Sequence, residues 1–82
     1  MPTIDLLGPY RFFFWSNEGF EPPHVHVERD ENTAKFWLAP VELAKNDGFR
    51  GHELTKLGEM VSEHQQEWLE KWHDHHRNRT TS

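Results

Sequence analysis

Two histidines and a glutamate alternate with valines in the segment Glu21–Glu28, which reads EPPHVHVE. Successive side chains of a β-strand point to opposite faces, so His24, His26 and Glu28 are expected on one face and the valines on the other. Two residues span about 6.5–7 Å along a strand, so both imidazoles can act on one ligand. The two prolines hold the chain extended, and strand pairing is expected to begin only after them.

Three functions of this histidine-bearing face stay open. As an acid/base pair on RNA, one imidazole would take the 2′-hydroxyl proton and the other would protonate the leaving oxygen, because imidazole titrates near neutral pH. Lys35 or Arg11 would then stabilise the charge on the phosphorane. As a zinc site, His24 and His26 would supply two ligands and either Glu28 or a tail histidine a third, although our main interpretation involves no cofactor. As the polar outer face of a sheet, it would pack on a partner and catalyse nothing.

A hairpin is predicted to carry this face. The polar turn at residues 29–32 precedes residues 33–38, in which apolar and other side chains alternate. Matching the apolar face of this return strand with the valines places Lys35 and Trp37 beside the histidines, and a base can stack on Trp37. The candidate catalytic residues are therefore His24, His26, Lys35 and Arg11, and the candidate binding residues are Glu28, Trp37 and Trp15.

The whole chain is predicted to form one α+β domain, a small antiparallel sheet of three to four strands packed by one long C-terminal helix. Residues 10–15 form an aromatic strand, residues 41–43 a short fourth strand, and residues 1–7 either an edge strand or an irregular lead-in. Apolar residues at three- and four-residue spacing predict the helix from about His52 to Trp72 or His73. The tail from about Asp74 is polar and is expected to fray.

The aromatic run at residues 12–15 predicts association. It is aromatic at positions of both parities, and one helix covers only one face of a sheet. An uncovered aromatic patch marks an interaction surface, so we expect a homodimer or a tight complex with another protein.

Composition narrows the function further. The 82 residues contain no cysteine, which excludes disulfides and thiolate zinc sites, and carry a formal net charge of −5, which disfavours sequence-independent binding to nucleic acid. No apolar run approaches the roughly 20 residues of a membrane span, so we expect a cytoplasmic protein without membrane contact.

The chain resembles the bacterial domain-of-unknown-function family 4160. The resemblance rests on the segments Tyr10–Gly19, Glu21–Asp30, Ala34–Leu38 and Pro40–Ala44, and above all on the Pro-Pro-His-x-His run. Arg50 departs from the family, where a helix-capping serine is expected. Members are small cytoplasmic proteins, often encoded beside a second small protein and commonly regarded as toxin-like components of toxin–antitoxin pairs.

The resemblance implies a toxin-type component that binds a cognate small protein and acts on RNA or translation. The alternative is a non-catalytic module, either antitoxin-like, homo-oligomeric or metal-binding. Whether the chain is an enzyme stays open.

Overall fold

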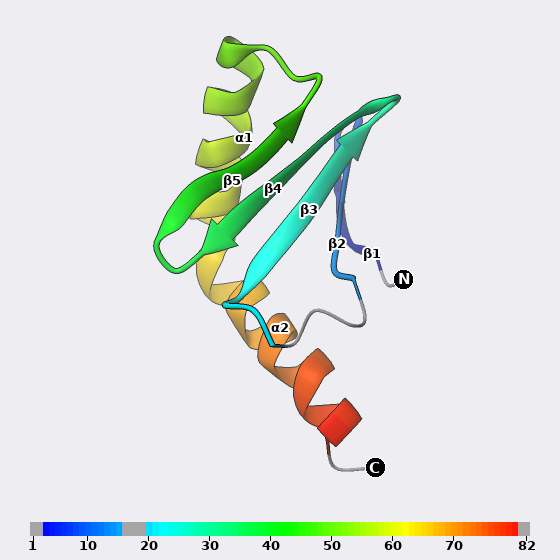
Figure 1. Ribbon diagram of the computed structural model, residues 1–82, viewed down its shortest axis with the longest axis vertical. Helices are drawn as coiled ribbons and strands as arrows, with labels where there is room; N and C mark the ends of the chain where they lie inside the picture. Colours follow the sequence, from blue (N-terminus) through cyan, green and yellow to red (C-terminus); the bar gives the residue numbers. More distant parts are fainter. Residues whose placement is uncertain (1–2, 16–19, 81–82) are drawn as a thin grey trace.

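A five-stranded antiparallel sheet lies against two helices in the computed structural model, which describes residues 3–15 and 20–80, with side chains in the last helix as far as His75. The elements are β1 (Thr3–Leu7), β2 (Tyr10–Phe13), β3 (His24–Arg29), β4 (Asn32–Leu38), β5 (Val41–Asp47), α1 (Gly51–Glu63) and α2 (Gln65–Thr80). The strands follow one another in space in the order β1-β2-β3-β4-β5. Figure 1 shows both helices on one face of this meander, with α2 continuing past the end of the sheet.

Tight turns join three of the strand pairs. Gly8, with φ 61°, turns β1 into β2, and Asp30, with φ 57°, turns β3 into β4. These positive φ values suit glycine and aspartate, which tolerate the left-handed region better than bulkier residues. A cis Ala39–Pro40 bond lies between β4 and β5.

The core lies between the sheet and the helices, and it confirms the predicted register. Val25 pairs with Phe36 and Val27 with Ala34 across β3 and β4, and all four side chains are buried. The helical stripe of Leu57, Val61 and Trp68 closes the same cluster, which also contains Tyr10, Phe12, Phe14, Leu38, Phe49 and Trp72. The α+β class and the antiparallel sheet are therefore as predicted.

The number of strands was underestimated, because β-bulges hide the alternation of both edge strands. In β1 the pairs Thr3–Phe13 and Asp5–Phe12 leave Ile4 as an extra residue. In β5 the pairs Lys35–Lys45 and Phe36–Leu43 leave Ala44 as another. A bulge shifts every later side chain to the opposite face, so a strand that contains one does not read as alternating.

The predicted single helix is two helices that meet at His64. The backbone of His64 has φ −106° and ψ 10°, and its Nδ1 lies 2.9 Å from the carbonyl oxygen of Met60. The backbone N–H of His64 is shared between the carbonyl oxygens of Met60 and Val61, both at 3.2 Å, so the helical hydrogen-bond pattern tightens at this residue. Helical conformation continues to Thr80, beyond the predicted end at residues 72–73. Arg50 occupies the N-cap and makes no side-chain cap hydrogen bond, as its type predicts.

The aromatic run is better covered than predicted. The rings of Phe12 and Phe14 pack against Trp68 and Trp72 of α2. Phe13 points to the other face and is still only 4% exposed, since neighbouring side chains on that face cover it. Trp15, at 43% exposed, leaves part of its surface open.

In the described part of the chain, no helix has both the length and the apolar character that crossing a bilayer requires.

Candidate functional site

The candidate site is the sheet face that the helices leave open, which we call the histidine face. Residues directly opposite one another on neighbouring strands point to the same face, so the register defines rows of side chains across the sheet. One row consists of Phe13 on β2, His26 on β3, Lys35 on β4 and Lys45 on β5. We call His26, Lys35 and Lys45 the basic row. The next row consists of Arg11, Glu28, Thr33 and Asp47.

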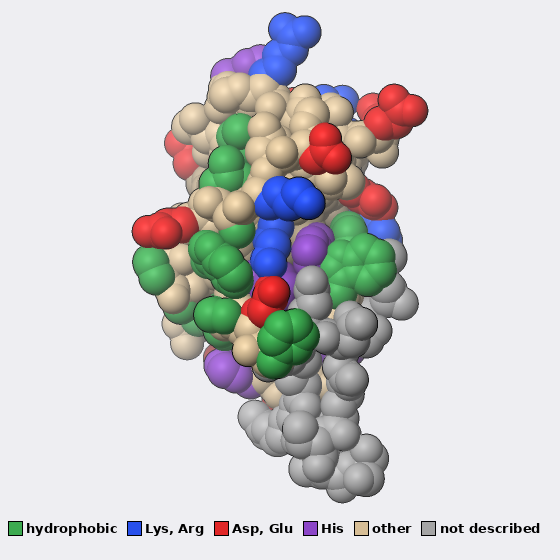
Figure 2. Space-filling model, viewed as in Figure 1, with side chains coloured by type: hydrophobic (Ala, Val, Ile, Leu, Met, Phe, Trp, Pro, Cys, Tyr) green, Lys and Arg blue, Asp and Glu red, His purple; other side chains and the backbone are tan. Residues whose placement is uncertain are grey.

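A hollow of about 360 Å³ lies over the basic row. Figure 2 shows hydrophobic, histidine and basic side chains beside one another on the side of the molecule where this hollow lies. Phe13 and Trp15 form its aromatic wall, and Glu28 and Asp47 add negative charge to its lining. The hollow therefore combines an aromatic surface with three nitrogen-bearing basic side chains, those of His26, Lys35 and Lys45.

His24 lies beside the hollow but is closed to solvent. Its side chain is 0% exposed and its ring contacts those of His26, Trp37 and Trp72, with centroid separations of 5.1, 5.7 and 4.7 Å. Its Nδ1 lies 2.9 Å from the carbonyl oxygen of Pro22. When Nδ1 carries the proton, it donates to that oxygen, which holds the ring in one tautomer. His24 is therefore a packed side chain held by the extended proline segment.

His26 is only partly buried and lines the hollow. Its ring stacks on Phe13 at 5.5 Å with an interplanar angle of 19°, and Trp15 meets it edge-on at 5.9 Å. Aromatic contacts of this kind hold an imidazole in a fixed orientation. Of the two histidines of the Pro-Pro-His-x-His run, only His26 lines the hollow.

Lys35 and Arg11 are both paired with carboxylates. The Nζ of Lys35 donates to Glu21 over 2.7 Å and lies 4.7 Å from the ring centre of Trp37. Arg11 donates to Glu28 over 2.6 Å and lies over the Phe13 ring at 4.6 Å. These pairs are partly exposed, so a negatively charged partner group can compete for either cation.

The structure thus brings most of the predicted residues together. Lys35 and Trp37 do lie on the face of the histidines, as the hairpin register predicts. The predicted zinc site is not formed: among the described residues, the donor atoms of His24, His26 and Glu28 do not lie close enough together to hold one metal ion. Lys45 and Glu21 were not predicted. Lys45 was missed because the bulge at Ala44 turns its side chain to this face. For Glu21, which forms an ion pair with Lys35, the only sequence signal was a negative charge beside the proline segment.

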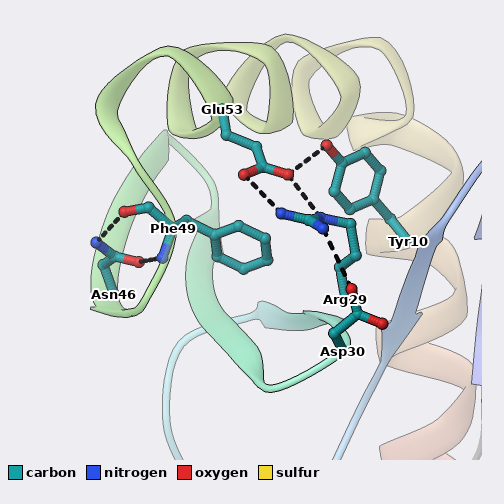
Figure 3. Close-up of polar contacts among 6 residues, drawn as sticks. All are labelled: Tyr10, Arg29, Asp30, Asn46, Phe49 and Glu53. Atoms are coloured by element: carbon teal, nitrogen blue, oxygen red, sulfur yellow. Dashed lines mark hydrogen bonds and ion pairs between the residues drawn. The ribbon is translucent and has the colours of Figure 1, made fainter.

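A second polar group fixes the far end of the sheet to α1, as Figure 3 shows. Glu53 accepts hydrogen bonds from Arg29 over 2.7 and 3.0 Å and from the Tyr10 hydroxyl over 2.8 Å. The Asn46 side chain bonds the backbone of Phe49 in both directions, over 3.0 and 3.1 Å. These contacts satisfy polar groups around a buried Phe49 ring and position the start of the helix.

The electrostatics of this group follow from the same bonds. The hydrogen bonds from Arg29, then from Tyr10, hold the pKa of Glu53 below its usual value. Burial, followed by the hydrogen bond to Glu53, raises the pKa of Tyr10. The hydrogen bond to Glu53 raises the pKa of Arg29. All three groups keep their ordinary charge at neutral pH, which is the behaviour of a structural anchor.

Comparison with known proteins gives one family. The family model described as "Domain of unknown function (DUF4160)" matches residues 10–73, a span from β2 into α2 that contains the histidine face. No curated protein and no solved structure matches the chain.

Proposed function

Because the chain belongs to the DUF4160 family, we propose that it is the toxin-type component of a two-protein toxin–antitoxin-like module and that it binds its partner through the histidine face. The observation that carries this proposal is the combination of a fully buried His24 with a hollow formed by His26, Lys35 and Lys45. Such a surface recognises a ligand, and the family setting makes a cognate small protein the expected one.

Binding fits this face better than two-histidine catalysis. A general acid must come within hydrogen-bond reach of the atom that it protonates. The His24 side chain is enclosed by Trp37 and Trp72, so the predicted pair reduces to one accessible imidazole. The net charge of −5 also works against an RNA backbone.

The face specifies the chemistry of the partner segment. Tryptophan and phenylalanine beside cationic side chains are typical of the centre of a protein interface. We expect an acidic side chain of the partner to lie on the basic row and an apolar neighbour to pack on Phe13 and Trp15. An incoming carboxylate would replace Glu21 on Lys35 and would relieve the repulsion between Lys35 and Lys45, which are directly opposite each other.

The test combines growth with copurification. The chain is expressed alone and with the small protein encoded beside it, and Lys45→Glu is compared with Lys56→Glu, an exposed lysine on α1. Placing a negative charge in the basic row should weaken the complex at least about tenfold, whereas the α1 change should not. Equal binding by both variants, or growth unaffected by the chain alone and by the pair, would contradict the proposal.

RNA remains the second candidate target, because His26, Lys35 and Lys45 form a row that also suits a phosphate, with Trp15 beside it for base stacking. The variant His26→Ala separates the two possibilities. Loss of toxicity with intact partner binding would favour an action on RNA. Parallel loss of toxicity and partner binding would favour the docking function.

A further inference from the structure

Three side chains on the opposite side of the sheet meet at the junction of β1 with the helices. Asp5, His64 and Glu67 each place one possible ligand atom within 4.8 Å of the other two. Zinc ligands at about 2.0–2.2 Å from the ion lie roughly 3.4 Å apart in a tetrahedral site, so small rotations bring these atoms into range. We propose that these residues, which we call the edge triad, bind one zinc ion and thereby join β1 to α2.

The bulge in β1 is what places Asp5 in the triad. Thr3 pairs with Phe13 and shares the histidine face, where its hydroxyl accepts a hydrogen bond from Arg11 over 2.7 Å. Without the bulge Asp5 would lie on that same face. The extra residue Ile4 turns Asp5 to the helix side, opposite Phe12. Bulges commonly re-aim a side chain beside a functional site.

The break between the helices prepares His64 as a ligand. Its Nδ1 bonds the carbonyl of Met60 over 2.9 Å, and its ring stacks on Trp68 at 4.9 Å with an interplanar angle of 16°. A ring that donates from Nδ1 carries its lone pair on Nε2, and metal-binding histidines are usually held by such a bond to a carbonyl. This contact at the junction of the two helices is therefore the support that a metal ligand needs.

Glu67 completes the triad three residues later on α2. Residues at i and i+3 lie on one side of a helix, and this spacing of glutamate and histidine recurs in metal sites of helical proteins. Lys71 Nζ lies 3.3 Å from Glu67 and donates to the Ile4 carbonyl over 3.2 Å. A metal ion would take over the charge neutralisation of Glu67, and Lys71 would keep its bond to β1.

The donor set points to zinc rather than to magnesium or calcium. One imidazole nitrogen and two carboxylate oxygens suit zinc, whereas the two lighter ions prefer oxygen ligands alone. Three protein ligands leave one of four tetrahedral positions for water. Zinc with two carboxylates and a neutral imidazole forms a site of zero net charge.

The test uses the purified full-length chain, stripped with a chelator and titrated with Zn²⁺. Zinc at roughly 100 times its Kd should raise the Tm by more than about 5 °C, with one ion bound per chain by calorimetry. His64→Gln and Glu67→Gln should each weaken zinc binding at least about tenfold, since each removes a ligand. The matched control is His73→Gln, an exposed histidine of α2 outside the triad, which should keep the parental affinity.

Each outcome decides the proposal. No heat of binding and no Tm shift would overturn it, and so would a loss of affinity in a control variant while the triad variants still bind. If His64→Gln fails to fold, Glu67→Gln decides, because the glutamate side chain is 54% exposed and its replacement leaves the core intact.

Discussion

His24 and His26 have the same side chain and lie two residues apart in the sequence, but the fold gives them different surroundings. The proline segment and Trp72 enclose His24, while His26 lies in the hollow beside Lys35. Packing therefore accounts for the His24 imidazole, whereas the His26 imidazole lines the hollow for which we propose a binding function. The residue types alone do not distinguish these roles, because both side chains point to the same face of β3.

The two histidines should differ in their effect on stability. His24→Ala removes a fully buried ring and should lower the free energy of unfolding by about 2–4 kcal/mol. His26→Ala removes a partly exposed ring and should cost about 1 kcal/mol or less. Urea unfolding of both variants measures the difference. Equal losses would mean that His24 is not the more deeply packed residue.

Glu53 should make stability depend on pH in the acid range. The bonds from Arg29 and Tyr10 lower its folded pKa from the usual 4.5, so its contribution is complete above that pH and is lost as the pH falls through the folded value. Glu53→Gln should therefore lower the Tm at pH 7, and the gap to the parent should close as the pH falls below 4.5 and through the lowered folded pKa. A gap that stays constant over this range would contradict the ionic origin of the anchor.

At the scale of elements, the sequence predicts the strands in which apolar and polar residues alternate, but it does not reveal the bulges that interrupt this alternation. Val25, Val27 and Phe36 specify the central hairpin, its register and its buried face without any structural knowledge. The sequence does not identify Ile4 and Ala44 as bulge residues, because the position of a bulge depends on pairing with a neighbouring strand. The two bulges place Asp5 in the edge triad and Lys45 in the basic row, the residues on which our two proposals depend.

The turn after β5 can be tested through its glycine. Gly48 has φ 111°, and a Cβ there would clash with the Asn32 side chain. Gly48→Ala should destabilise the protein by more than about 1 kcal/mol, because alanine rarely adopts this backbone conformation. Gly51→Ala is the matched control, since Gly51 begins α1 with nothing within 4 Å of its added Cβ. Thermal unfolding of the pair should show a loss only for Gly48→Ala.

At the scale of the whole molecule, the two sides of the sheet carry different groups of residues. The helices bury one side of the sheet and supply two ligands of the edge triad, while the other side carries the aromatic wall and the basic row. Phe13 shows that side chains of a single sheet face can bury an aromatic ring among themselves. Within residues 12–15, the open aromatic surface is thereby confined to Trp15, a smaller area than the sequence predicts.

This division predicts how the chain associates. We expect a homodimer or a tight complex with the neighbouring small protein, formed through the histidine face. Trp15→Ala should weaken association at least about tenfold with little change in Tm, because the side chain is 43% exposed and tryptophan often dominates binding energy. The matched control is Leu43→Ala, a side chain of similar exposure at 44%, which lines a groove between β5 and α1. Sedimentation of the chain alone and mixed with the neighbour measures both variants. A monomer without affinity for the neighbour would contradict the prediction, and a stronger effect of Leu43→Ala would move the interface to the helix side.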